Sequence, residues 1–277
     1  MFLNTVVFVL HELLEAALLL SLLLVLNRLL NRYSTEQLVI SLWWVPIAIV
    51  IGLAGAWLFA HFYSQVSEWF DYVGFEVTNA FIQILIMLAL ILFCYMFSIR
   101  ARLQATATLA WLAPLLMIVM LALGIAREVS EIILYLDGVL AVPENISPAI
   151  LGTIMATGIG ISSGIVLYYG LEAMPVSWRF RLCMVMLALF AGNTASQATV
   201  LLIQADWLPY TGQAWDSAQL LPEQFVIGQI LYILIGYEAN PSVLQMSLYA
   251  VLTMVVVFSP LALLAWRGAW AASEGAE

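Results

Sequence analysis

The stretch NTVVFVLHELLEAALLLSLLLVL, residues 4–26, decides the fold of this chain. At ~1.5 Å per residue, a helix of this length crosses the ~30 Å hydrocarbon core of a membrane. The stretch is apolar almost throughout, yet it contains Glu12 and Glu15. Further apolar stretches of similar length lie at 38–60, 77–99, 112–136, 148–170, 182–204 and 243–266. The sequence therefore predicts an all-α, polytopic membrane protein with seven transmembrane helices.

The composition agrees with lipid as the main solvent of the chain. Of its 277 residues, 65% are hydrophobic and 9% are charged, and the mean hydropathy is +1.05. The chain has eight arginines, no lysine and a net charge of −9. Because such a chain cannot form a basic patch, the composition excludes nucleic acid as a partner. The first apolar run lacks a basic segment before it, so we expect a span there and not a cleaved signal peptide.

The positions of the charged residues predict the orientation in the membrane. All arginines except Arg127 fall on one side of the predicted spans: Arg28, Arg32, Arg100, Arg102, Arg179, Arg181 and Arg267. The opposite loops are acidic and contain Glu68, Asp71, Glu76, Asp137, Glu144, Asp206, Asp216, Glu223 and Glu238. By the positive-inside rule the N-terminus faces out and the C-terminus faces in. The acidic face would concentrate cations, although these charges also follow from the charge rule alone.

A shorter apolar stretch at 224–237 precedes the last predicted span. It is too short to cross the membrane easily, so we interpret it as an interfacial or re-entrant helix. In the fifth span, the spacing of Gly160 and Gly164 predicts close packing against a neighbouring helix. Cys94 and Cys183 each lie within an apolar run and are expected to be small buried residues without a disulfide.

Six ionisable residues remain inside the predicted spans: His11, Glu12, Glu15, Arg127, Glu128 and Glu131. A charge at the centre of a span costs roughly 2.5–3.5 kcal/mol, so four unpaired carboxylates would cost on the order of 10 kcal/mol. Neutral glutamates that hydrogen-bond between helices are the structural alternative. The spacing favours a functional interpretation, because residues three apart lie on one helix face and both glutamate pairs have this spacing.

The two glutamate pairs suggest an internal duplication. The Glu12/Glu15 pair lies in the first span and the Glu128/Glu131 pair in the fourth. Asn79 and Gln83 in the third span have the same spacing as Asn193 and Gln197 in the sixth, and we expect Asn193 and Gln197 to support the site that the glutamates form. We therefore predict a single membrane domain, 1–277, with inverted three-helix repeats at about 1–107 and 108–208. An outer loop and the seventh span follow at about 209–277.

Four converging carboxylates predict a metal cation as ligand. Carboxylate oxygens suit magnesium, calcium, manganese and iron, whereas Cu(I) prefers sulfur and zinc prefers histidine or cysteine. The four glutamates and Arg127 sum to a formal charge of −3, which a ferric ion would neutralise, as would a ferrous ion with protonated His11. Glu76 is a candidate for cation capture at the outer mouth. The metalloprotease pattern His-Glu-x-x-His lacks its second histidine at Glu15, so we expect a transporter without a cofactor and not an enzyme.

These motifs resemble the high-affinity iron permeases, also called oxidase-dependent iron transporters. That family repeats Arg-Glu-Gly-Leu-Glu in its first and fourth spans. Here the corresponding segments are His11-Glu12-Leu13-Leu14-Glu15 and Arg127-Glu128-Val129-Ser130-Glu131. The segment Gly236-Tyr237-Glu238-Ala239-Asn240-Pro241-Ser242, with Gln245 and Tyr249 after it, is similar to the family's Gly-Tyr…Pro-Ser segment.

The resemblance implies iron import across a bacterial inner membrane, with Glu12, Glu15, Glu128 and Glu131 as the iron ligands. It also implies a ferroxidase or a periplasmic iron-delivery protein as a possible partner. The first motif has His11 where the family has arginine, so His11 is either a ligand or a proton carrier, and either valence of iron remains open. A permease for another divalent metal, such as manganese or lead, and a membrane metal sensor or assembly subunit without transport are the alternatives.

Overall fold

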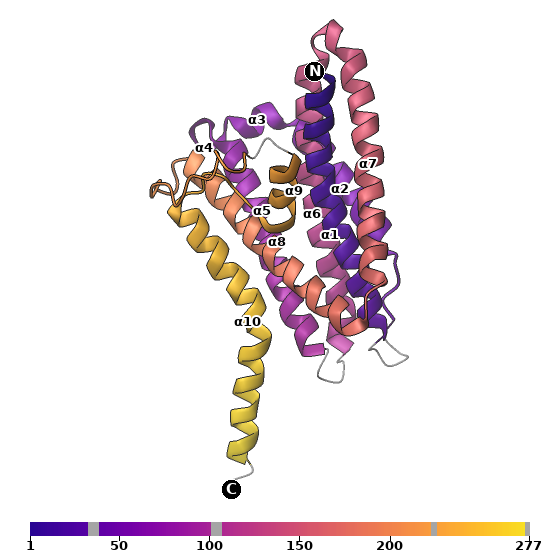
Figure 1. Cartoon of the computed structure of the whole chain (residues 1–277), viewed down its shortest axis with the longest axis vertical. Coiled ribbons are helices and arrows are strands. Elements are labelled where there is room, and N and C mark those ends of the chain that lie inside the picture. Colours follow the sequence, from indigo (N-terminus) through magenta and orange to yellow (C-terminus); the bar gives the residue numbers. More distant parts are fainter. Residues whose placement is uncertain (33–38, 101–106, 223–225, 275–277) are drawn as a thin grey trace.

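A computed structural model describes residues 1–32, 39–100, 107–222 and 226–274 of the chain (Figure 1). The regular elements of this part are all helices, and it contains no β-strand but a single isolated bridge between Gln213 and Ser242. The all-α prediction is confirmed. Arg102 and Glu223, which the sequence assigns to opposite loops, lie outside the described residues.

Six helices of the described part are long and apolar enough to cross a membrane. The chain is therefore an integral, multi-pass membrane protein. Their bounds are α1 (Phe2–Arg32), α2 (Trp44–His61), α5 (Gly74–Arg100), α6 (Ala107–Leu140), α7 (Ile146–Glu172) and α8 (Val176–Gln204). Most of them continue past the apolar stretch that predicts them, but α2 begins only at Trp44, after the start of the predicted stretch 38–60. Residues 39–43, directly before it, are not helical.

The remaining elements are one long helix and several short ones. Helix α10 (Val243–Glu274) begins at the first residue of the last predicted span, and its residues Val243–Phe258 are apolar. Helix α9 (Val226–Ile235) has ten residues and extends only ~15 Å, half the hydrocarbon thickness. The prediction of a short helix here is confirmed. The connections contain α3 (Tyr63–Ser67), α4 (Trp69–Tyr72) and the 3-10 turn η1 (Pro143–Asn145).

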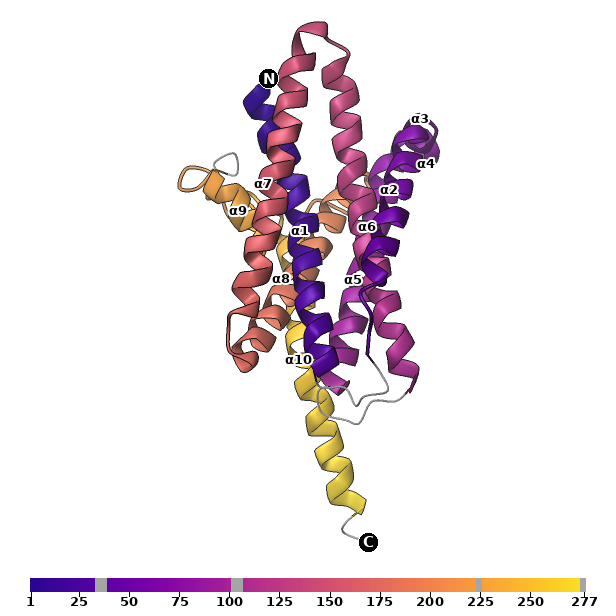
Figure 2. The same ribbon diagram turned by 90° about the vertical axis from the view of Figure 1, so that its right-hand side faces the viewer.

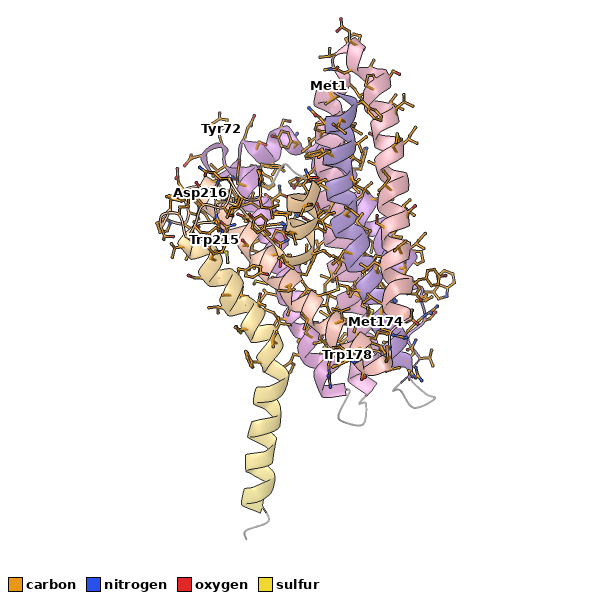
Figure 3. The ribbon with its side chains drawn as sticks, in the orientation of Figure 1. Met1, Tyr72, Met174, Trp178, Trp215 and Asp216 are labelled. Carbon is orange, nitrogen blue, oxygen red and sulfur yellow. The ribbon has the colours of Figure 1, made fainter. Side chains whose placement is uncertain are left out.

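The loops lie at two opposite ends of the molecule. Tyr72, Trp215 and Asp216 lie on the side toward Met1, whereas Met174 and Trp178 lie at the other side (Figure 3). We call the side with the 61–74 and 205–242 connections the acidic end. The side with the α7–α8 connection is the arginine end. Helices α5 and α8 consequently run in opposite directions, and the start of α1 and the end of α10 lie toward opposite ends of the long axis (Figure 1).

The helices of the two predicted halves pack in a reciprocal way (Figure 2). Helix α1 packs along α7, and α6 packs along α2. Each half thus packs its first helix against the second helix of the other half, while α5 lies against α8 and α1 against α6. Small residues allow this closeness: a Cβ at Gly160 would lie 3.1 Å from Leu13 Cβ, and one at Gly164 would lie 3.1 Å from Ala17 Cβ. The packing predicted from these two glycines is confirmed.

The main hydrophobic core lies on the arginine side of the glutamates. On α1 it begins directly after Glu15 with Leu18, Leu19 and Leu22, and on α6 it includes Met117 and Met120, which precede Arg127. These side chains are at most 4% exposed. The four glutamates therefore lie on the acidic-end side of a closed apolar layer.

Candidate cation site

The four glutamates predicted as ligands lie together around the guanidinium group of Arg127. Arg127 Nη1 lies 2.8 Å from Glu128 Oε1 and 3.6 Å from Glu15 Oε2, and Arg127 Nε lies 3.3 Å from Glu131 Oε1. Glu12 belongs to the same group, because it lies one turn from Glu15 on the same face of α1. We call these five residues the carboxylate cluster.

Helix geometry explains how the cluster forms. Residues three apart lie on one helix face, so α1 presents Glu12 and Glu15 together, and α6 presents Glu128 and Glu131. Because α1 packs against α6, the two faces meet. A hydroxyl contact between Thr5 and Tyr135, at 3.1 Å, joins the same two helices nearer the acidic end.

The cluster is largely shielded from solvent. Glu12, Glu15 and Glu128 are 5%, 4% and 4% exposed, whereas the side chain of Glu131 is 25% exposed. Charges in such surroundings interact strongly, because little water screens them. Glu128 Oε2 is buried without a hydrogen-bond partner, so the cluster has oxygen capacity that Arg127 leaves unused. Glu131 is the most accessible of the four carboxylates.

His11 stands at the margin of the cluster. Its Nε2 lies 3.7 Å from Glu15 Oε1, and its ring lies 5.0 Å from that of Tyr232 on α9, between centroids. Tyr232 was not predicted as a neighbour of the site, because the apolar residues of α9 do not indicate which buried group the helix contacts.

A cavity of about 350 Å³ adjoins the cluster at His11. It lies between α1, α7 and α9, and its walls are mainly aliphatic, with His11, Ser163 and Gln229 as polar groups. Such a lining does not suit a bare cation, which needs several oxygen ligands. The cavity is therefore a neighbour of the cluster and not the cation site itself.

Four buried amides extend from the cluster along α5 and α8. Asn79, Gln83, Asn193 and Gln197 are 1%, 1%, 2% and 6% exposed. The amides of Gln83 and Gln197 are in contact, and the Gln83 atom at this contact also faces Arg127. With this atom as Oε1, it accepts hydrogen bonds from Arg127 Nη1 at 2.7 Å and from Nε at 3.2 Å. We call these four residues the amide row.

Most of the amide row has hydrogen-bonding capacity that nothing fills. Asn79 Oδ1 and Asn193 Oδ1 are buried without a partner, as is the outer amide atom of Gln197. Asn79 lies one turn from Gln83 toward the acidic end, and Asn193 lies one turn from Gln197 toward the arginine end. The predicted supporting residues Asn193 and Gln197 therefore belong to this row and are not part of the carboxylate cluster.

Glu76, the predicted capture residue, lies apart from the cluster. It is in the first turn of α5, two turns from Gln83, and its Oε2 is buried without a partner. Within the described ranges, no three His, Cys, Asp or Glu side chains are gathered into a preformed metal site. The guanidinium of Arg127 lies between the carboxylates instead.

A second ionic group, which the sequence analysis missed, closes the arginine end. Glu172 Oε2, at the end of α7, lies 3.1 Å from Arg179 Nη1 and 3.6 Å from Arg28 Nη1. Arg179 also donates to the backbone carbonyls of Glu172 and Met174, and Arg28 lies over the ring of Tyr168. This group ties together α1, α7 and α8.

Comparisons of the chain with protein families, with curated proteins and with solved structures find no match.

Proposed function

We propose that this protein is a permease that moves a metal cation, iron, across the membrane through the carboxylate cluster. One observation carries this proposal: carboxylates from two helices surround a cationic group deep in the protein, and that cation belongs to the chain itself. A site that holds the guanidinium of Arg127 in this way has the charge and the oxygen atoms to hold a metal cation.

The donor set favours a hard metal ion. Glu12, Glu15, Glu128 and Glu131 offer up to eight carboxylate oxygens, and iron and manganese accept such ligands. His11, beside Glu15, could add a nitrogen ligand. The bound ion must displace Arg127 from its contacts with three carboxylates. A polyvalent ion does this better than a monovalent one, because its attraction to the carboxylates is stronger.

The proposed topology has seven spans, with α10 as the seventh. The acidic end would face outward and the arginine end the cytoplasm, by the positive-inside rule, in the inner membrane of a bacterium. The reciprocal packing of α1 with α7 and of α6 with α2 supports inverted repeats. A ferroxidase or periplasmic iron-delivery protein would supply iron at the acidic end.

Transport requires the apolar layer below the cluster to open. Leu18, Leu22 and Met120 close the route toward the arginine end, as does the Glu172 group further along. Rocking of one repeat against the other would expose the cluster to each side in turn. The membrane potential assists inward movement by ~2.3 kcal/mol per charge per 100 mV.

Uptake of iron into proteoliposomes tests the proposal. Glu12→Gln and Glu128→Gln, each of which keeps side-chain volume and removes a charge, should reduce the initial rate at least tenfold. Glu144→Gln, an exposed residue of the η1 turn, is the matched control; it removes one of several charges at the acidic end and should change the rate by less than twofold. Wild-type rates in both cluster variants would refute the proposal.

Two further results would identify the alternatives. Competition by manganese or lead at concentrations lower than that of iron would assign the permease to that metal. Metal binding without any flux in the wild-type protein would make it a sensor or an assembly subunit.

A further inference from the structure

When a metal ion binds to the carboxylates, the guanidinium of Arg127 loses the carboxylate acceptors that it contacts in the metal-free structure. Arginine cannot lose its charge in a protein, and its five N–H donors need acceptors wherever it is buried. A metal ion bound by Glu15, Glu128 and Glu131 would repel the guanidinium and use the oxygens that it now contacts. Arg127 must then find other acceptors nearby.

The amide row is the neighbouring group that can supply them. Gln83 Oε1 already accepts from Arg127 Nη1 and Nε, at 2.7 and 3.2 Å. For Gln197 to donate to the same Gln83 oxygen, its amide nitrogen must face Gln83. The outer atom of Gln197, buried without a partner, is then its carbonyl oxygen, a free acceptor. Asn79 Oδ1 and Asn193 Oδ1 are also unpaired.

Unpaired polar atoms in buried positions are costly and call for an explanation. A buried group without a hydrogen bond costs about 1–3 kcal/mol, so a row of such groups is not expected without a use. The free atoms of Asn79, Asn193 and, in this orientation, Gln197 are oxygens, which suit a donor. The row is also neutral, so it can hold a guanidinium without competing with the carboxylates for the metal.

We infer that the amide row is the receiving site for Arg127: the guanidinium is shared between the carboxylates and Gln83 when the cluster is empty, and it lies on Gln83 and Gln197 alone when a metal ion is bound. This inference rests on the proposed function. Gln83 and Gln197 are positioning residues: they set the metal affinity by supplying hydrogen-bond acceptors to the displaced guanidinium of Arg127. Since they lie on α5 and α8, one in each predicted half, metal binding alters the contact between the halves.

A double-mutant cycle tests the inference. Metal affinity is measured on the full-length protein in detergent with Fe²⁺ under anaerobic conditions, and with Mn²⁺ as a second probe. Gln83→Met preserves the side-chain length and removes the acceptor, so it should weaken binding at least tenfold. In an Arg127→Met background the same substitution should have an effect of less than twofold, because no guanidinium remains to be received.

The outcomes separate the inference from the proposed function. If the wild-type protein binds neither metal, the proposed function fails. If it binds, but Gln83→Met weakens binding equally in both backgrounds or has no effect, the receiving site is refuted. Gln65→Met, an exposed residue of α3, is the matched control and should not change the affinity. If Gln83→Met does not fold, Gln197→Met enters the same cycle with the same expected results.

Discussion

The side-chain amides of Gln83 and Gln197 touch between α5 and α8, although 114 positions separate them in the sequence. The two residues hold equivalent places in the predicted halves, since each follows an asparagine by four positions. A contact between equivalent residues is what a two-fold relation between the halves would produce at its axis. Arg127 contacts the same amide pair through Gln83, and it thereby links the pair to the carboxylate cluster.

Removing Arg127 should destabilise the metal-free protein. Arg127→Met leaves buried carboxylates without their counterion, and breaking a buried ion pair in this way costs about 3 kcal/mol or more. The midpoint of thermal unfolding should fall, and Fe²⁺ or Mn²⁺ should raise it by more in the variant than in the wild type, since the metal can then bind without displacing a guanidinium. An unchanged midpoint without metal would contradict the role of Arg127 as counterion.

In the ionic group at the arginine end, the pair of Glu172 with the buried Arg179 should contribute more to stability than the pair of Glu172 with the exposed Arg28. Glu172→Gln leaves Arg179, whose side chain is 11% exposed, without a carboxylate and should destabilise the protein by about 1–3 kcal/mol. Arg28→Gln removes a side chain that is 58% exposed and should cost less than about 1 kcal/mol. Thermal unfolding of the two variants measures the difference. A larger effect from Arg28→Gln would reverse this order and refute the assignment.

The contact between α7 and α1 should tolerate no added side chain at Gly160. Gly160→Leu places a side chain against Leu13 and should destabilise the protein by about 1–3 kcal/mol. A Cβ at the exposed Gly158, on the same helix, would meet nothing within 4 Å, so Gly158→Leu should change the stability by less than about 0.5 kcal/mol. Equal effects from the two substitutions, measured by thermal unfolding in detergent, would contradict this packing.

The orientation can be read from chemical labelling of intact cells. In a background of Cys94→Ser and Cys183→Ser, which removes both buried thiols, Glu144→Cys should react with a membrane-impermeant maleimide. Trp178→Cys, an exposed position at the arginine end, should react only after the cells are permeabilised. The opposite pattern would reverse the proposed topology.

Much of the fold follows from the sequence because lipid imposes simple requirements on a chain. Spans need long apolar stretches, so the positions of the six spans and of the short helix α9 could be predicted. The helix ends could not: α1 extends to Arg32 and α6 to Leu140, where polar and apolar residues mix. The grouping of Glu12 with Glu15 and of Glu128 with Glu131 follows from helix geometry alone.

The rest of the site depends on tertiary packing that no local pattern encodes. Arg127 is adjacent to Glu128 in sequence, yet its contact with Glu15 needs α1 to lie against α6. The Gln83–Gln197 contact likewise needs α5 to lie against α8. Glu172 was missed because a charged residue at the end of a span is unremarkable until its partners, Arg28 and Arg179, are known.

Counterflow of iron in proteoliposomes tests the central claim most directly. Vesicles that contain the wild-type protein are loaded with unlabelled iron and then exposed to a trace of labelled iron outside. A permease with one cation site that opens to each side in turn should accumulate label inside transiently above the outside concentration. The Glu12→Gln/Glu128→Gln double variant should show no such accumulation. If label accumulates equally with both proteins, or with neither, the carboxylate cluster is not a transport site for iron.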